Sequence, residues 1–144
     1  MAGSEVIQGP LQVLDRAECL RLLATVGVGR VVVPVGPSAR PVIRPIHFAF
    51  DEVSQSVVFR SAQGGKLYAL MHSGRATFEA DEVDASARNG WSVIIEGATE
   101  PVTDAMELRR LERLQVPGWV GGPEARWMRI RARTVSGRRL TAPD

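Results

Sequence analysis

Six short segments of this 144-residue chain are rich in β-branched and aromatic residues and are bounded by turn-forming residues. They span residues 29–35, 41–50, 56–61, 75–81, 91–102 and 127–140. Only three helical segments interrupt these strands, and strand and helix do not alternate as they do in a doubly wound α/β sheet. The order therefore predicts a mainly β domain: a six-stranded antiparallel barrel with short flanking helices.

Two of the helical segments begin with the spacing of a capping box. Asp15 is followed three residues later by Glu18, and Asp104 by Glu107, so each aspartate can accept a hydrogen bond from a free backbone N–H group of the first turn. We expect the first helix to run to Gly27. The residues expected on the buried face of the second helix are Met106, Leu111 and Leu114.

Two of the strand segments contain residues that interrupt a β ladder. Residues 41–50 contain two prolines, and proline has no N–H to donate, so this strand should lie at a sheet edge or carry a bulge. Gly97 lies within the longest segment, residues 91–102, and predicts a bend or bulge there.

Composition is that of a soluble globular protein, with 44% apolar and 24% charged residues. An apolar stretch of membrane-spanning length and a signal-peptide pattern are both missing, so we expect a cytoplasmic protein with no membrane partner. The single cysteine, Cys19, excludes an internal disulfide framework. We expect one domain at residues 13–140, preceded by an arm at 1–12 and followed by a tail at 141–144.

The residue types of common metal and nucleic-acid sites are also missing. Two histidines, one cysteine and no H-E-x-x-H motif make a protein-ligated metal improbable. Arg129, Arg131 and Arg133 alternate along one predicted strand, but no aromatic residues are interleaved for base stacking. We interpret these arginines as a solvated strand face and expect no nucleic-acid partner.

The stretch FRSAQGGKLYAL, residues 59–70, is the strongest candidate for a binding site. A strand ends here in a Gly-Gly turn, and a short helix begins at Lys66, the only lysine of the chain. Backbone N–H groups at a helix start bind anions, and Arg60, Ser61 and Lys66 add charge and a hydroxyl. The Walker pattern is incomplete. A plain glycine turn with an exposed lysine is the alternative that this local pattern leaves open.

Two other residues admit both a structural and a functional interpretation. His47 alternates with Ile46 along its strand and either hydrogen-bonds a ligand or forms a satisfied structural contact. Trp91 opens the longest strand and either fills a core or interface, or forms a wall for a planar ligand.

Taken in order, several segments resemble the pyridoxamine 5′-phosphate oxidase-like flavin-binding split barrels, in particular small actinobacterial members. The segments that carry the resemblance are ECLRLLATVGVGRVVV, PVIRPIHFAFD, VVFRSAQGGKL, FEADEVD, GWSVIIEGATEPV and RIRARTVSGRRL. The resemblance extends from about Leu14 to Leu140. It implies a six-stranded split β-barrel that forms a homodimer, with FMN bound in two clefts between the subunits.

The resemblance also implies a role for ten residues in binding FMN. The isoalloxazine ring would lie along Pro45, Ile46, His47 and Phe48. The phosphate would be held by Arg60, Ser61, Gly65 and Lys66. Trp91 and Ser92 would close the pocket, often from the other subunit.

The chain departs from the true pyridoxamine-phosphate oxidases at its C-terminal end. The Arg-x-His pair of those enzymes has no counterpart in SGRRLTAPD, which argues against oxidation of that vitamer. We expect an FMN-dependent oxidoreductase acting on an unassigned small-molecule substrate, with no catalytic acid or base assigned. The alternatives are a deazaflavin (coenzyme F-420)-dependent reductase and a non-catalytic flavin- or haem-binding protein.

Overall fold

The computed structural model describes residues 11–62, 65–71, 74–117 and 125–142, with the side chain of Lys66 excepted. The strands are β1 (Leu11–Leu14), β2 (Val28–Val35), β3 (Arg40–His47), β4 (Ala49–Asp51), β5 (Ser56–Ala62), β6 (Gly74–Asp84), β7 (Asn89–Pro101), β8 (Ala125–Arg131) and β9 (Thr134–Leu140). The helices are α2 (Arg16–Leu23), α3 (Lys66–Leu70) and α4 (Ala105–Glu112).

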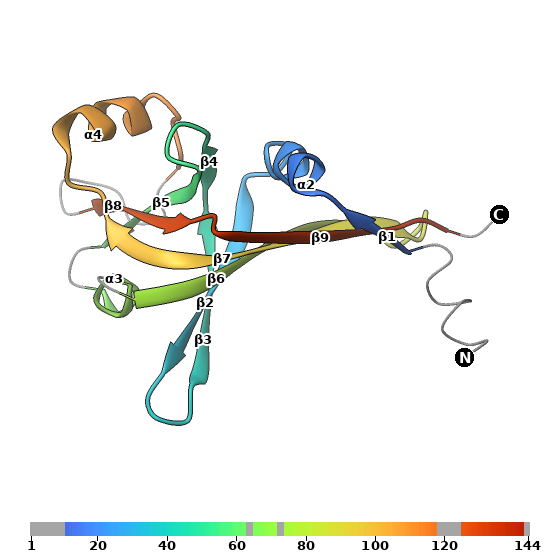
Figure 1. The fold of residues 1–144 in the computed structure, drawn as a ribbon, viewed down its shortest axis with the longest axis horizontal. Coiled ribbons are helices and arrows are strands. Elements are labelled where there is room, and N and C mark those ends of the chain that lie inside the picture. Colours follow the sequence, from blue (N-terminus) through green and yellow to red (C-terminus); the bar gives the residue numbers. More distant parts are fainter. Residues whose placement is uncertain (1–10, 63–64, 72–73, 118–124, 143–144) are drawn as a thin grey trace.

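All strands join one antiparallel sheet in the order β3-β2-β6-β7-β8-β5-β4, and β9 pairs with both β7 and β1. β3 and β4 lie at opposite ends of this order although only Phe48 separates them in the sequence. The sheet therefore curls around without closing, which confirms the predicted split barrel. β9 and β1 extend away from the curled part together with the hairpin of β6 and β7 (Figure 1).

The described part of the chain has nine strands where the sequence predicted six. Two expected strands are each divided in two. Phe48 leaves the ladder between β3 and β4 because its N–H donates to Gly27 O at 3.0 Å. Ala132 and Arg133 separate β8 from β9, and the N–H of Ala132 donates to Gln55 O at 2.9 Å. β1 is the ninth strand and includes Leu11 and Gln12 from the predicted arm.

The prolines and the glycine that were predicted to interrupt strands lie at a sheet edge and at a change of strand partner. β3, with its two prolines, is an edge strand, as expected. Gly97 lies where β7 exchanges one neighbour for another: β7 pairs with β9 as far as Glu96 and with β8 from Thr99 onward. A Cβ atom on Gly97 would lie 1.8 Å from the Arg131 carbonyl oxygen, so this exchange requires glycine.

Both predicted helix caps are confirmed. Asp15 Oδ1 accepts a hydrogen bond from Glu18 N at 2.9 Å, and Asp104 Oδ2 accepts one from Glu107 N at 3.0 Å. The first helix ends earlier than expected, at Leu23 rather than at Gly27.

The buried face predicted for α4 is wrong in two of its three residues. Leu111 is fully buried, but Met106 is 76% exposed, and Leu114, which lies beyond the end of α4, is 40% exposed. The helix is rotated because Glu107 and Arg110 turn toward the sheet and form ion pairs there. Hydrophobic periodicity considers apolar residues only, so it cannot predict that ion pairs turn a helix toward its charged residues.

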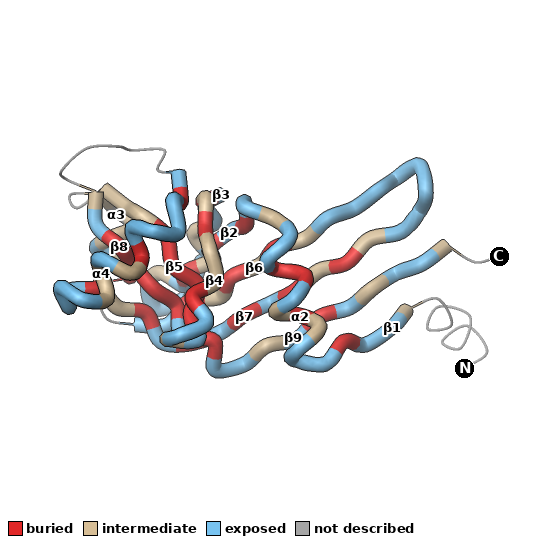
Figure 2. Tube along the Cα trace, turned by 90° about the horizontal axis from the view of Figure 1, so that it is seen from above, coloured by how far each residue is buried: buried red, intermediate tan, exposed pale blue. Residues whose placement is uncertain are grey.

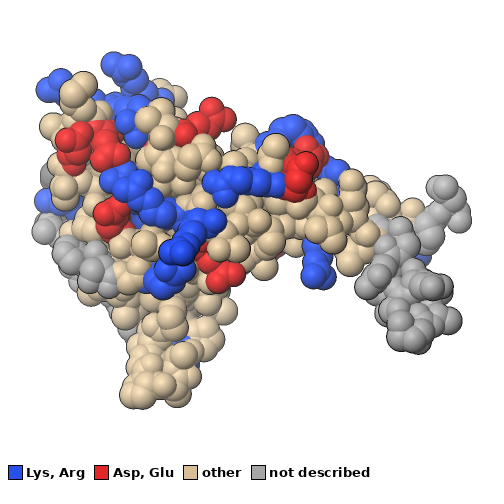
Figure 3. Space-filling view, in the orientation of Figure 1, with Lys and Arg blue, Asp and Glu red and all other residues tan. Residues whose placement is uncertain are grey.

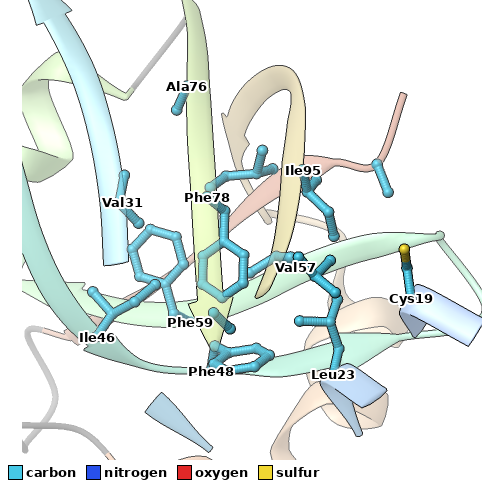
Figure 4. Close-up of a cluster of buried hydrophobic side chains, with 14 of the residues drawn as sticks. Cys19, Leu23, Val31, Ile46, Phe48, Val57, Phe59, Ala76, Phe78 and Ile95 are labelled. Atoms are coloured by element: carbon cyan, nitrogen blue, oxygen red, sulfur yellow. The ribbon is translucent and has the colours of Figure 1, made fainter. Parts of the chain in front are cut away.

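The hydrophobic core is divided into two clusters. The larger one lies inside the curled sheet, where Phe48 and Phe78 pack edge to face with ring centroids 4.7 Å apart (Figure 4). The smaller one lies under α4 and includes Leu111 and Trp127, so Trp127 is a core residue. Buried positions run through the middle of the molecule, whereas the loop joining β6 to β7 is exposed (Figure 2).

Candidate functional site

A hollow of about 290 Å³ lies where the end of β3 meets the end of β5 and the start of α3. Its lining residues are Arg44, Pro45, Ile46, His47, Arg60, Ser61, Ala62, Gly65, Leu67 and Pro117. The fold thus brings together the two segments from which the sequence predicted ring and phosphate contacts. Six of the ten predicted residues line this hollow: Pro45, Ile46, His47, Arg60, Ser61 and Gly65.

One wall of the hollow is an edge strand. β3 pairs only with β2 in the described part of the chain, which leaves the N–H and C=O groups of its other edge outside any ladder. Ile46 points into the core and is 7% exposed, which anchors the strand, whereas Pro45 is exposed and His47 half-buried. The unpaired N–H and C=O groups of such an edge are available to hydrogen-bond a polar ligand.

Arg60 supplies the most specific feature of the hollow. Its Nε is buried and has no hydrogen-bond partner; among the described residues only Thr99 Oγ1 shares this condition. Leaving a buried donor unpaired costs about 1–3 kcal/mol, more for a charged group. A bound anion would remove this cost, and Ser61 beside Arg60 adds a hydroxyl donor.

The lining of the hollow is basic. It contains the two arginines Arg44 and Arg60, and no acidic residue is among the described residues that line it. Arg44 is exposed at the rim, where its Nη1 donates to the carbonyl oxygen of Ile43 at 2.9 Å. The hollow therefore favours a negatively charged group.

The turn before α3 fits closely around Gly65. Its N–H donates to Ala62 O at 3.0 Å, and a Cβ on Gly65 would lie 3.2 Å from the same oxygen. The predicted contribution of the helix start is small, because α3 has only five residues. The side chain of Lys66 lies outside the described residues, so its assignment stays a prediction.

Three of the predicted residues lie away from this hollow. Phe48 is 4% exposed in the core and borders a different hollow beside α2. Trp91 and Ser92 line a third hollow of about 390 Å³ near the loop that joins β6 to β7. Within one chain they do not meet the residues of β3 and β5, and their closing role stays a prediction about a second subunit.

The sequence missed four lining residues: Arg44, Ala62, Leu67 and Pro117. The first three lie in the same two segments, 41–50 and 59–70, from which the other lining residues were predicted, so the same sequence patterns could have included them. Pro117 follows α4, more than fifty positions from Gly65, and no local pattern connects the two.

The predicted solvated face of the arginines in β8 is wrong for Arg129. This residue is 6% exposed, and its side chain donates to Glu107 at 2.6 and 3.0 Å and to Glu100 at 3.0 Å. Its burial follows from the position of β8 beneath α4. Acidic and basic side chains are interspersed around this region (Figure 3).

The described ranges contain no group of three or more His, Cys, Asp or Glu side chains arranged to hold a metal ion. None of their helices is long and apolar enough to cross a membrane.

Comparison with known proteins gives a consistent result. A family model described as pyridoxamine 5′-phosphate oxidase matches residues 15–139. The solved structure of the FAD binding protein from Mycobacterium smegmatis is 32% identical and has a TM-score of 0.81, covering 92% of this chain and 100% of that one.

Two similar proteins carry no described activity. A conserved protein of unknown function from Corynebacterium diphtheriae is 30% identical with a TM-score of 0.74, covering 92% of this chain and 99% of that one. An uncharacterized protein of Mycobacterium tuberculosis is 34% identical over 90% of this chain and 85% of its own length.

Proposed function

The chain belongs to the pyridoxamine 5′-phosphate oxidase family, and from this premise we propose that the hollow between β3 and β5 binds the riboflavin phosphate part of a flavin. The buried, unpaired Arg60 Nε in a basic hollow carries the proposal. It is further supported by the similar Mycobacterium smegmatis protein, which is described as binding FAD.

We propose FMN as the smallest sufficient cofactor. FMN and FAD share the isoalloxazine ring, the ribityl chain and the first phosphate, so Arg60 and Ser61 would serve either of them. Arg44 lines the hollow at its rim, and we propose that it would meet the second phosphate of FAD and so distinguish FAD from FMN. The preference for FMN or FAD would therefore depend on Arg44 at the rim of the hollow, and not on the residues that hold the shared phosphate.

The residues of the hollow would each do a separate task. Arg60 and Ser61 would hold the phosphate, and the free edge of β3 near Pro45 and His47 would hydrogen-bond the polar edge of the ring. Ile46 keeps this edge in place from the core side. A bound flavin would supply hydride transfer to or from a small-molecule substrate, and we propose an oxidoreductase of this kind.

We also propose that the working form is a homodimer. Ligand pockets usually measure about 300–1,000 Å³ and enclose most of the ligand, whereas this hollow measures about 290 Å³ and is open. One chain thus covers only part of a flavin. A second chain would complete the enclosure, and Trp91 and Ser92, which one chain leaves apart from the hollow, are the residues proposed to do so.

Titration of the purified protein tests this function. FMN, FAD, riboflavin and the deazaflavin coenzyme are added separately, and binding is followed by quenching of their fluorescence. We expect FMN and FAD to bind and riboflavin to bind more weakly. Binding of the deazaflavin alone would assign the other cofactor class, and a Soret band on addition of haem with no flavin binding would contradict the proposal.

A further inference from the structure

Arg60 borders the smaller core cluster as well as the hollow. Its register partner on β8 is Trp127, and Val58, two positions earlier on β5, lies opposite Arg129. Residues two apart along a strand and their cross-strand partners share one face of a sheet. Val58 and Trp127 are buried on this face beneath α4, which lies over β8 in Figure 1. The surroundings of Arg60 therefore depend on how α4 and the residues that follow it pack on the sheet.

The residues that follow α4 connect the smaller cluster with the hollow. Val116 belongs to the cluster and is 6% exposed, whereas its neighbour Pro117 lines the hollow. Just before them, Gln115 has a left-handed backbone conformation with a φ of 54°. A residue other than glycine keeps this conformation only where the surrounding structure imposes it. Burial of Val116 thus fixes the course of the chain and, with it, the position of Pro117 at the hollow.

An ion pair and a buried side chain hold α4 on the same face. Glu107 accepts two hydrogen bonds from Arg129, at 2.6 and 3.0 Å, and Leu111, one turn further along the helix, is fully buried in the smaller cluster. Bidentate pairs of arginine with carboxylate are strong and geometrically specific. α4 therefore has a fixed position on the sheet, and the segment that ends at Pro117 starts from it.

Exclusion of water from Arg60 affects how much a phosphate gains by binding. Arg60 Nε is buried and has no hydrogen-bond partner among the described residues, so its hydrogen bond is available to a ligand. If Pro117 moved away from the hollow, water would hydrate Nε in the free protein, and a phosphate would first have to displace that water. The attraction between the two charges would also fall as the surroundings became more polar. The affinity for a phosphate therefore depends on the residues that hold Pro117 in place.

We propose that Val116 and Glu107 are positioning residues of the anion site: they hold Pro117 at the hollow and thereby keep Arg60 free of water for a phosphate. Neither of them is among the described residues that line the hollow. This inference rests on the proposed binding of a flavin phosphate and assigns residues outside the hollow to that site. It applies to FMN and FAD alike, because both carry the first phosphate.

Two valines of the smaller cluster provide a matched test. Val116 and Val102 are 6% and 5% exposed, but only Val116 adjoins Pro117. Val116→Ala and Val102→Ala remove the same atoms from one cluster and should lower stability to a similar extent in urea unfolding. We expect Val116→Ala to reduce the preference for FMN over riboflavin, measured as the ratio of their dissociation constants, at least about threefold. Val102→Ala should leave this ratio unchanged.

Substitution Glu107→Gln tests the ion pair separately. It keeps the size of the side chain and the helix cap, in which the backbone N–H of Glu107 donates to Asp104, but removes the charge that pairs with Arg129. We expect the same fall in the preference for FMN, while the dissociation constant of riboflavin changes less than about twofold, because riboflavin has no phosphate. Glu112→Gln, on the exposed side of α4, is the control.

The outcomes separate this inference from the proposed function. A wild-type protein that does not prefer FMN to riboflavin overturns the proposed function and the inference with it. A preference that requires Arg60 but survives both Val116→Ala and Glu107→Gln overturns only the positioning role. An equal loss of affinity for both ligands, or the same fall in Val102→Ala as in Val116→Ala, also overturns it. Circular dichroism confirms folding, and Glu107→Gln decides alone if Val116→Ala does not fold.

Discussion

Arg110 of α4 holds the carboxylate of Asp51 at both oxygens. Its Nη2 lies 2.7 Å from Oδ2 and its Nε lies 3.3 Å from Oδ1. Asp51 is only 4% exposed and ends β4, the strand at the open edge of the barrel. Ser54 also donates to Oδ2 from its backbone N–H and its hydroxyl. This one side chain thereby joins the edge strand, the following turn and α4.

Substitution Asp51→Asn should destabilise the fold by about 2–4 kcal/mol at pH 7, because it leaves the partly buried Arg110 with the more distant Glu107 carboxylate, 3.7 Å away, in place of Asp51. Burial tends to raise the pKa of Asp51, but the hydrogen bonds from Arg110 and Ser54 outweigh it and lower the pKa. The stabilisation is therefore present above the ordinary aspartate pKa and lost as the pH falls through the lowered value. Urea unfolding at pH 7 and pH 3 should show the difference from wild type shrinking in acid. Glu112→Gln, on the exposed side of α4, is the control.

Substitution Gly97→Ala should prevent folding or destabilise it by more than about 3 kcal/mol. The added Cβ would overlap the carbonyl oxygen of Arg131 at 1.8 Å, and every atom nearest to it is backbone of Arg131 or Arg133, so no flexible side chain can move aside. Gly27→Ala is the matched control, because a Cβ there meets nothing within 4 Å. Thermal unfolding of the two variants should separate them clearly. A Gly97→Ala protein as stable as Gly27→Ala would contradict the described exchange of strands at this position.

Substitution Glu79→Gln should raise stability at pH 8 by about 1–2 kcal/mol. Burial and the neighbouring Asp81 carboxylate raise the pKa of Glu79 to about 7, in spite of Arg30. Because the folded state binds this proton more tightly than the unfolded state does, wild-type stability falls as the pH rises from about 4.5 to 7. Urea unfolding at pH 5 and pH 8 and one protein concentration checks this. If the wild type and the variant lose the same stability between pH 5 and pH 8, a group other than Glu79 is responsible for the pH dependence.

The edge position of β3 and the helix starts could be predicted from local sequence because each depends on nearby residues. Asp15 needs only the N–H of Glu18, and the prolines of β3 exclude it from the middle of a sheet. The rotation of α4 could not be predicted in this way. It depends on Arg129, more than twenty positions away, which draws Glu107 inward by a bidentate ion pair.

The candidate site likewise has features that local sequence could predict and features that depend on distant parts of the chain. Arg60 and Ser61 could be predicted as anion-binding residues because a strand, a glycine turn and a helix follow one another in 59–70. His47 could be predicted as a ring contact because the segment that contains it resembles those of the flavin-binding split barrels. The sequence could not show that Arg60 Nε is buried and unpaired. Nor could it show that Trp91 lies apart from the hollow in one chain, because that depends on the strand order, in which β6 and β2 separate β7 from β3.

The central claim is that Arg60 binds the phosphate of a flavin, and the most direct test compares FMN with riboflavin. These ligands differ only in the phosphate, so the ratio of their dissociation constants isolates its contribution. We predict that wild-type protein binds FMN at least about tenfold more tightly than riboflavin and that Arg60→Gln brings this ratio close to one. Arg113→Gln, at the end of α4, should leave it unchanged. A ratio that Arg60→Gln does not alter would contradict the claim.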